Sequence, residues 1–206
     1  MGITKMSKVG FTSASYLKSD SFLVGNAAFS PPAYESIETI NITSNTASIT
    51  FSTIPATFTH LQLRVLGRTD RSGSAYDAFL IRANNDATNA NYTYHYIEGQ
   101  GTTPTAGQEN GTYSGAVIYR IPGAGATASI FGGTITDILD YRNTNKYKTL
   151  RSLGGFDNNS ASPAGDIYYG SNLWINTAAI TSLVIVPRTG TNFVQYSSFA
   201  LYGIKG

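Results

Sequence analysis

Residues 60–65 read His-Leu-Gln-Leu-Arg-Val, so that apolar side chains occupy every second position. Successive side chains of a β-strand point to opposite faces of the sheet, whereas a helix repeats its apolar positions every three or four residues. The alternation therefore predicts a strand with one face in a core and the other face turned to solvent. Segments 79–82 and 117–121 have the same period.

This period of two extends outward from residues 60–65 to cover the chain from residue 34 onward. About eleven short strands are predicted, at 36–42, 47–53, 60–65, 79–82, 92–98, 117–121, 130–139, 147–153, 166–174, 182–186 and 193–204. Turn-forming residues separate them, and no amphipathic helix of about twelve residues fits anywhere. The predicted fold is all-β: a two-sheet antiparallel β-sandwich, jelly-roll-like. Residues 99–112, with four glycines and a proline, are expected to form a mobile loop.

The first 33 residues do not share this pattern, and they end at Pro31-Pro32, where two fixed φ angles prevent a helix or a central strand from continuing. We therefore predict two parts, an extended N-terminal docking arm at 1–33 and the β-sandwich domain at 34–206. Scattered apolar side chains would let the arm dock on another protein. The candidates are Phe11, Tyr16, Leu17, Phe22, Leu23 and Phe29.

Composition narrows the range of partners. Charged residues make up 13% of the chain and the net charge is +2, whereas soluble domains usually carry about 25% charged residues. Binding to nucleic acid or to an acidic membrane calls for clustered Lys and Arg, so neither partner is expected. Because little like-charge repulsion builds up, copies of the chain can pack closely. Exposed strand edges also need cover, so a homo-oligomer is expected.

Few residues suggest catalysis. His60 and His95 are the only histidines and the chain has no cysteine, so no metal site, cofactor or catalytic residue is predicted. Asp137 and Asp140 lie three residues apart, which places them on opposite faces of a strand. Asp140 could instead meet Asp157 or Asp166 across strands, and Arg142 and Arg151 are plausible ion-pair partners. A polysaccharide depolymerase using Asp137, Asp140 and Asp157 is thus a less favoured alternative.

Two loops resemble ligand sites only weakly. Residues 84–91 offer several oxygen ligands but lack the glutamate and central glycine of a calcium loop, so a hydrogen-bonded polar turn is the favoured interpretation. Whether a metal binds there stays open. Residues 123–127 are rich in glycine, but no Lys-Ser or Lys-Thr pair follows, so they are interpreted as a turn rather than a phosphate loop.

Tyrosine is abundant, with 14 copies. A tyrosine ring buries a large area at low entropic cost while its hydroxyl still forms hydrogen bonds, which suits both glycan and protein contacts. Three tyrosines share one face of segment 92–98, and others gather in the latter half of the chain. The candidates for glycan contact are Tyr92, Tyr94, Tyr96, Tyr141 and Tyr147. The alternative is that these rings pack in the core.

Four segments together resemble a domain that recurs in virion proteins of tailed bacteriophages, especially phages of marine and freshwater bacteria. They are YESIETI at 34–40, FSTIPATFTHLQLR at 51–64, ILDYRNTNKYKTLR at 138–151 and SFALYGIK at 198–205. The resemblance spans residues 34–206. In that family the domain often lies at the distal end of fibre-like proteins, and the resemblance implies no catalytic residues.

The resemblance implies a non-enzymatic virion protein, made in the host cytoplasm, whose partners are other capsid or tail proteins. No long fibre shaft precedes the domain, so a capsid decoration or a short tail-associated fibre or adhesin is expected. The alternative is a carbohydrate-binding module that recognises host surface glycan. The sequence does not distinguish a capsid from a tail location.

Overall fold

The computed structural model describes residues 23–24, 27–28, 33–160 and 164–206. The chain divides into two units, Met1–Ala33 and Tyr34–Gly206. In the first unit, strand β1 (Leu23–Val24) pairs antiparallel with β2 (Ala27–Ala28). Among the described residues of the second unit, the strands form an eight-stranded and a four-stranded sheet.

The strands of the second unit have the following bounds: β3 (Tyr34–Asn41), β4 (Ile49–Phe51), β5 (His60–Gly67), β6 (Tyr76–Ala83), β7 (Tyr92–Gln100), β8 (Thr103–Asn110), β9 (Ala116–Pro122), β10 (Gly132–Ile138), β11 (Lys148–Phe156), β12 (Asp166–Trp174), β13 (Leu183–Pro187) and β14 (Ser198–Ile204). One short 3-10 helix, η3 (Asn89–Asn91), precedes β7.

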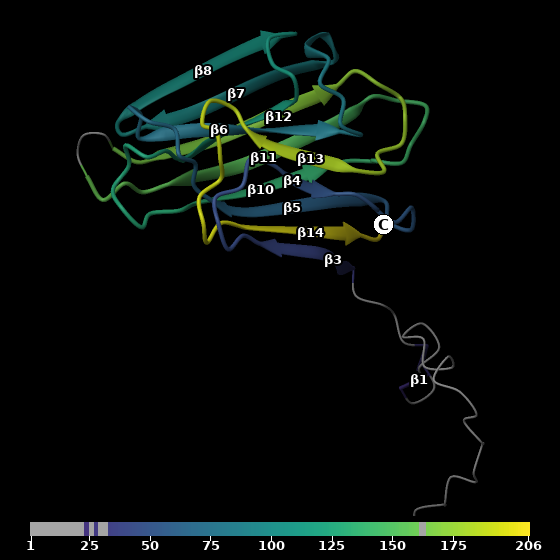
Figure 1. Ribbon diagram of the computed structural model, residues 1–206. Coiled ribbons are helices and arrows are strands. Elements are labelled where there is room, and N and C mark those ends of the chain that lie inside the picture. The colour runs from purple at the N-terminus through teal and green to yellow at the C-terminus, as the bar shows by residue number, and fades with distance from the viewer. Residues whose placement is uncertain (1–22, 25–26, 29–32, 161–163) are drawn as a thin grey trace, which may run out of the picture. The chain divides into compact units, whose positions relative to one another are not determined.

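The two sheets have jelly-roll connectivity. The large sheet has the order β3-β14-β5-β10-β11-β12-β7-β8, and the small sheet has the order β4-β13-β6-β9 (Figure 1). Pairing is antiparallel throughout. The chain passes between the two sheets at β3 to β4, β4 to β5, β5 to β6, β6 to β7, β8 to β9, β9 to β10, β12 to β13 and β13 to β14. When the pairs β7–β8 and β11–β12 are set aside, the remaining orders β3-β14-β5-β10 and β4-β13-β6-β9 are those of an eight-stranded jelly roll. The predicted fold class is therefore confirmed.

Two inserted hairpins widen the large sheet. The pair β7 and β8 lies between β6 and β9 in the chain, and the pair β11 and β12 lies between β10 and β13. Both pairs join the large sheet beyond β10, and β9 of the small sheet packs against β10, β11, β12 and β7. The part of the large sheet farthest from β3 is thus built mainly from insertions.

The expected mobile loop at 99–112 was wrong, because Thr103–Asn110 form strand β8. The register pairs Gln100 with Thr103, so β7 and β8 are joined by a two-residue turn in which Gly101 has φ +54°. Pro104 is tolerated because β8 is the edge strand and needs a partner on one side only. Gly107 is needed because a Cβ there would lie 2.7 Å from the Tyr96 ring.

The predicted alternation in β5 is confirmed, and it defines the core. Leu61, Leu63 and Val65 are buried between the sheets, whereas Arg64 and Leu66 are exposed on the opposite face. Aromatic side chains fill the interior, where Phe193 packs edge-to-face on Phe199 with ring centroids 4.8 Å apart. The face of the large sheet that points away from the small sheet is called the outer face below.

The described part of the chain contains no helix with the length and apolarity required to span a bilayer.

Candidate functional site

The outer face of the large sheet exposes a group of large apolar side chains. Six of them come from five strands, and each leaves about half of its surface in solvent. They are Leu66 (51% exposed), Ile97 (59%), Ile135 (43%), Leu153 (52%), Ile167 (62%) and Tyr169 (46%). Scattered exposed apolar residues need no explanation, but a contiguous group on one sheet face is typical of an interaction surface.

Strand register arranges these side chains into a continuous row, which we call the apolar ridge. Ile135 pairs with Leu153, Leu153 with Tyr169, and Tyr169 with Ile97. Ala106 on the edge strand β8 extends the row, because it pairs with Ile97. Directly paired residues on one face of an antiparallel sheet lie about 5 Å apart, so these side chains contact one another across the strands.

A second row, two residues farther along each strand, is rich in glycine, and we call it the glycine trough. The register pairs Gly133 with both Leu66 and Gly155, Gly155 with Ile167, and Ile167 with Gly99. Glycine in a strand interior weakens a sheet and often marks the close approach of a ligand or of another backbone. The trough therefore combines three positions without side chains and two exposed apolar ones.

A polar row flanks the ridge on its other side. Its members are Gln62, Asp137, Arg151, Ser171, His95 and Gln108. The Gln62 side-chain amide donates to Asp137 at 2.9 Å, and the Arg64 side chain donates to Gln62 Oε1 at 2.9 Å. Arg64 and Asp137 are thus held by neighbours in the same sheet, and Arg151 lies 3.9 Å from Asp137.

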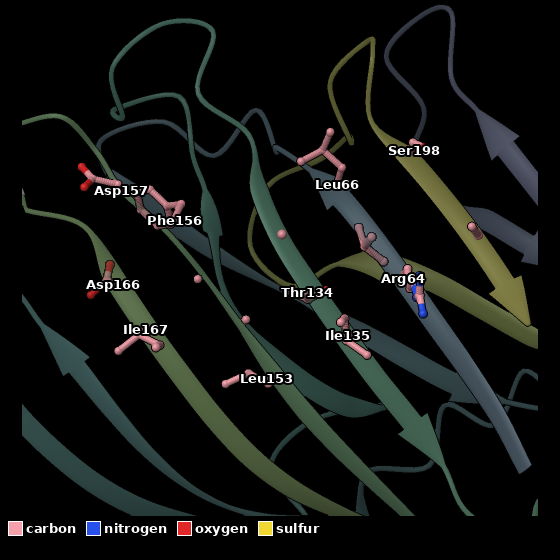
Figure 2. A pocket seen from close by; sticks show the side chains of 15 residues that line it. Arg64, Leu66, Thr134, Ile135, Leu153, Phe156, Asp157, Asp166, Ile167 and Ser198 are labelled. Atoms are coloured by element: carbon pink, nitrogen blue, oxygen red, sulfur yellow. The ribbon is translucent and has the colours of Figure 1, made fainter.

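The surface is hollowed along these rows. One hollow of about 710 Å³ lies over the trough, and Gly133 and Gly155 are among its lining residues. Figure 2 shows the side chains of Leu66, Ile135, Leu153 and Ile167, which also line it. A second hollow of about 500 Å³ lies between β12 and β8 and is lined by Ile97, Pro104 and Tyr169, among others. Both hollows are shallow and apolar, which suits the insertion of apolar side chains from a partner.

Most of the tyrosines predicted to contact glycan lie inside the sandwich, and this corrects the expectation of an exposed cluster. Tyr92, Tyr94 and Tyr141 are buried, and Tyr96 is half-buried. Their strand alternates as predicted, but the shared face points inward because it packs against β9 of the small sheet. Of the five candidates, only Tyr147 is exposed.

The buried rings form a tyrosine cluster between the two sheets. Its members are Tyr94, Tyr96, Tyr113, Tyr119 and Tyr168, with ring centroids 5.6 to 6.1 Å apart. The Tyr94 and Tyr119 hydroxyls lie 3.0 Å apart. Burial raises the pKa of Tyr119 to about 12 and raises the pKa of Tyr94 further still. These hydroxyls therefore stay protonated and stabilise the interior rather than meeting a ligand.

Sequence reasoning missed a charged group beside this cluster. Arg120 donates to Glu98 from Nε at 2.8 Å, and its guanidinium lies 3.9 Å from the Tyr76 ring centroid. Asp166 Oδ2 is 4.0 Å from Arg120 Nη1, and the side chain of Asp166 is 1% exposed. Among the described residues, neither carboxylate oxygen of Asp166 has a hydrogen-bond partner. Desolvation, with a smaller contribution from Glu98, raises the pKa of Asp166 despite the nearby Arg120.

A backbone feature aims Arg120 inward. The register of β6 and β9 shifts at Asp77 and Ala78, and Arg120 has φ +71°. Such a bulge inserts one extra residue and redirects its side chain. A single sequence gives no signal for the bulge, because the alternation through β9 predicts a solvent-facing Arg120. The resulting carboxylate pair, Glu98 and Asp166, is buried and beyond the reach of a polysaccharide.

The structure does not bring together the acids of the depolymerase alternative. Asp137 lies on the outer face, 3.9 Å from Arg151, which confirms that ion-pair partner. Asp140 forms an ion pair with Lys146 and lies 3.5 Å from His60 Nδ1. Asp157 follows β11 at the opposite end of the sheet, where Asp166 pairs with Phe156 in the register. Asp140 therefore meets neither of these acids, because the backbone N–H of the adjacent Leu139 donates to the carbonyl of Thr149 near the start of β11, whereas the other two acids lie beside the end of β11.

Arg142 pairs with no carboxylate among the described residues and donates to the carbonyl of Ala56. The other histidine, His95, belongs to the polar row and is exposed. Within residues 33–160 and 164–206, no group of three or more His, Asp or Glu side chains is placed to hold a metal ion.

The loop at 84–91 is a hydrogen-bonded polar turn, as favoured. Asp86 accepts from Trp174 Nε1 at 2.8 Å, from the Asn91 amide at 2.7 Å and from the Thr88 backbone at 2.9 Å. Burial raises the pKa of Asp86, but these hydrogen bonds outweigh burial and hold the pKa below its usual value. The carboxylate is thus engaged in joining the turn to β12.

Residues 123–127 also form a turn, as predicted. The backbone N–H groups of Gly123, Ala124 and Gly125 donate to the carbonyls of Ala75, Arg71 and Ser74, so they are not aimed at an anion.

The docking residues predicted for the arm are not tested by the structure. Phe11, Tyr16, Leu17, Phe22 and Phe29 lie outside the described residues, and Leu23 belongs to the short strand β1.

No model of a protein family, no curated protein and no solved structure matches the chain.

Proposed function

We propose that the chain is a non-enzymatic structural component of a tailed-phage virion. Residues 1–33 anchor it to other virion proteins, and the sandwich at 34–206 is displayed on the particle surface. Two locations fit this role, a capsid decoration or a short tail-associated fibre or adhesin that contributes to host attachment.

The observation that carries the proposal is the apolar ridge on the outer face. A protein that assembles with many neighbours needs a broad surface that excludes water, and the ridge crosses five strands of one sheet. Jelly rolls occur in viral capsid and lectin domains, which is compatible with this role but does not by itself establish it. The low charge of the chain favours dense packing beside neighbours.

Mass spectrometry of purified particles from the phage that encodes the chain tests the proposal. We expect peptides from residues 34–206 at many copies per particle, and cryo-EM of the same particles would assign the density to the capsid or to the tail. If the protein is expressed in infected cells but is missing from purified particles, the proposal is wrong.

Glycan recognition remains a second candidate, and one observation favours it. A hollow of about 560 Å³ is lined by Tyr169 together with His95, Gln108 and Ser171 of the polar row. An exposed ring beside hydrogen-bonding side chains is a common way to hold a sugar. A glycan array should then give hits that Tyr169→Ala abolishes and that Tyr147→Ala leaves unchanged, because Tyr147 is not among the lining residues. An array without hits would contradict this candidate.

A further inference from the structure

We propose that the outer face is an isologous interface, in which two copies of this chain pack their large sheets face to face about a two-fold axis. The apolar ridge of each copy lies in the glycine trough of the other. This inference rests on the proposed function, because it names the partner of the same surface.

Self-complementarity of the two rows identifies a second copy as the occupant. A large side chain and a glycine lie two residues apart on the outer face of three strands: Ile135 and Gly133 on β10, Leu153 and Gly155 on β11, and Ile97 and Gly99 on β7. A two-fold axis between the rows and parallel to them reverses the strand direction of the partner. It therefore places each large side chain opposite the glycine of the same strand in the other copy.

The spacing of the rows suits this packing. Two residues along a strand cover about 7 Å, and facing sheets lie about 10 Å apart with interdigitated side chains. On β10, β11 and β7 the large side chain of one copy therefore finds space at the glycine of the other. The remaining three strands depart from this pattern: their ridge and trough positions hold Tyr169 and Ile167 on β12, Arg64 and Leu66 on β5, and Ala106 and Pro104 on β8.

Two of the three glycines are not required by the fold of one copy. A Cβ on Gly133 would meet nothing within 4 Å, and a Cβ on Gly99 would make an ordinary 3.4 Å contact with Ile167. Gly155 differs, since it has φ +150° and a Cβ there would lie 2.1 Å from the Asp166 carbonyl oxygen. The fold of one copy thus gives no reason for a glycine at position 133. The free space there lies on the face that the second copy would cover.

The exposed apolar area approaches the area that one partner buries in a standard interface. If a large apolar side chain offers roughly 200 Å² when fully exposed, six such side chains at about half exposure offer roughly 600 Å². This equals the upper end of the largest apolar patch on a typical monomer, about 300–600 Å². It also supplies most of the roughly 800 Å² that each partner buries in a standard interface.

Sedimentation equilibrium on the full chain tests the interface. We expect a dimer at about 10 μM, a concentration at which interfaces of this size commonly associate. Leu153→Arg should raise the dissociation constant at least tenfold, because it places an unpaired charge in the centre of the ridge. The matched control is Thr39→Arg, which adds the same charge to the outer face of β3 and should leave association unchanged. A chain that stays monomeric at about 100 μM, or that forms a trimer, overturns the proposal.

Gly133→Ile provides a second variant that does not depend on removing an apolar side chain. Because a Cβ at this position would meet nothing within 4 Å in one copy, the circular dichroism spectrum should match that of the natural chain. The filled trough should abolish dimerisation, and a dimer of unchanged strength would contradict the pairing of ridge and trough.

Cysteine cross-linking tests the axis directly, since the natural chain has no cysteine. Because facing sheets lie too far apart for a direct disulfide, a short bismaleimide cross-linker should join Gly133→Cys and Ile135→Cys chains in a mixture, whereas each variant alone should cross-link several-fold less. Equal cross-linking within the single-variant samples would overturn the proposed axis.

The outcomes separate this inference from the proposed function. A chain that is abundant in particles but monomeric in solution contradicts the interface and supports the virion role. A chain that dimerises through the ridge but is missing from particles contradicts the virion role and supports the interface.

Discussion

At the residue scale, Asp166 is a carboxylate held in the interior with no hydrogen-bond partner in the part of the chain that the structure describes. Glu98 already balances the charge of Arg120, so ionised Asp166 adds an uncompensated negative charge to a buried group. Below pH of about 3.9 the carboxyl is protonated in the folded and unfolded states alike. As the pH rises through the raised pKa of the folded state, ionisation destabilises the fold.

We therefore expect Asp166→Asn to raise the melting temperature at pH 7, by about 2–4 °C if the gain is about 1 kcal/mol. The difference from the natural chain should vanish near pH 3.5. Thermal unfolding followed by circular dichroism between pH 3.5 and 8 measures both values. Glu38→Gln, at an exposed position on β3, is the control and should change little at any pH. A destabilised Asp166→Asn protein at pH 7 would refute the expectation.

Gly155 and Gly133 face each other in the register of β10 and β11 but differ in what they tolerate. Gly155→Ala forces a side chain into a backbone conformation of φ +150° and against the Asp166 carbonyl, so it should destabilise the fold by about 2 kcal/mol or more. Gly133→Ala should be neutral, or stabilising by about 0.5–1 kcal/mol. Urea unfolding of dilute protein gives both values, and equal losses for the two variants would show that the contrast is mistaken.

At this scale the sequence predicted which side chains share a face of a strand better than it predicted whether that face is buried. Alternation placed Tyr92, Tyr94 and Tyr96 on one face correctly, but it does not say which face is buried, and the second sheet covers theirs. The same limit concealed Arg120, whose inward direction depends on a bulge. The exposed Ile97, Ile135 and Leu153 gave no signal, because alternation alone does not reveal that a strand lacks cover on its second face.

At the scale of elements, β8 depends on β7 alone. Its other side is the edge of the sheet, and its residues are mostly exposed. Local opening should therefore be easier here than in central strands such as β5. In hydrogen exchange followed by mass spectrometry, we expect peptides covering 103–110 to exchange at least tenfold faster than peptides covering 60–67. Comparable protection of the two segments would contradict this order of stability.

Gly107 keeps β8 attached, because the Tyr96 ring occupies the space where a side chain would begin. Gly107→Val should therefore raise exchange throughout 103–110 and leave 60–67 unchanged. Gln108→Ala, on the other face of the same strand, is the matched control and should have no effect.

The sequence predicted eleven strands of the second unit but not β8, because the residues of β8 are untypical of a central strand. Pro104, Gly107 and the lack of large apolar side chains are unfavourable in a central strand and harmless at an edge. Position in the sheet, rather than local propensity, decided the conformation of this segment. The place of a strand within the sheet depends on pairing with strands distant in the sequence, and the alternation of apolar residues along one strand carries no information about that pairing.

At the scale of the whole molecule, the proposed dimer is held by apolar contacts, since the charges near the ridge are satisfied within each copy. Salt screens exposed charges but hardly affects the burial of apolar surface. The dissociation constant measured by sedimentation should therefore change less than about threefold between 50 and 500 mM NaCl. Weakening by more than tenfold would point to charge pairing and count against the ridge.

Deletion of residues 1–30 separates anchoring from folding. The sandwich forms its own core, so the truncated chain should keep its melting temperature within about 2 °C. If the arm anchors the protein, the truncated chain should be missing from purified particles by mass spectrometry. Incorporation at the natural level would refute the anchoring role.

At this scale the sequence predicted a jelly-roll-like sandwich at 34–206, because a chain of short, half-buried strands has few other ways to cover its apolar faces. It did not predict the division into eight and four strands, since strand order follows from pairing between distant segments. The apolar ridge and the glycine trough were missed for the same reason, because these rows form only when six strands are aligned in the sheet.

The two inserted hairpins can change in sequence and length more freely than the eight strands of the jelly roll. The eight strands of the jelly roll bury one another, and their substitution is restricted by packing. By contrast, β11, β12, β7 and β8 supply most of the ridge, and each hairpin enters and leaves the framework at a loop. Relatives could therefore exchange or lose these hairpins and acquire different neighbours while keeping the same framework. Surveys of related chains should find length variation concentrated between β6 and β9 and between β10 and β13.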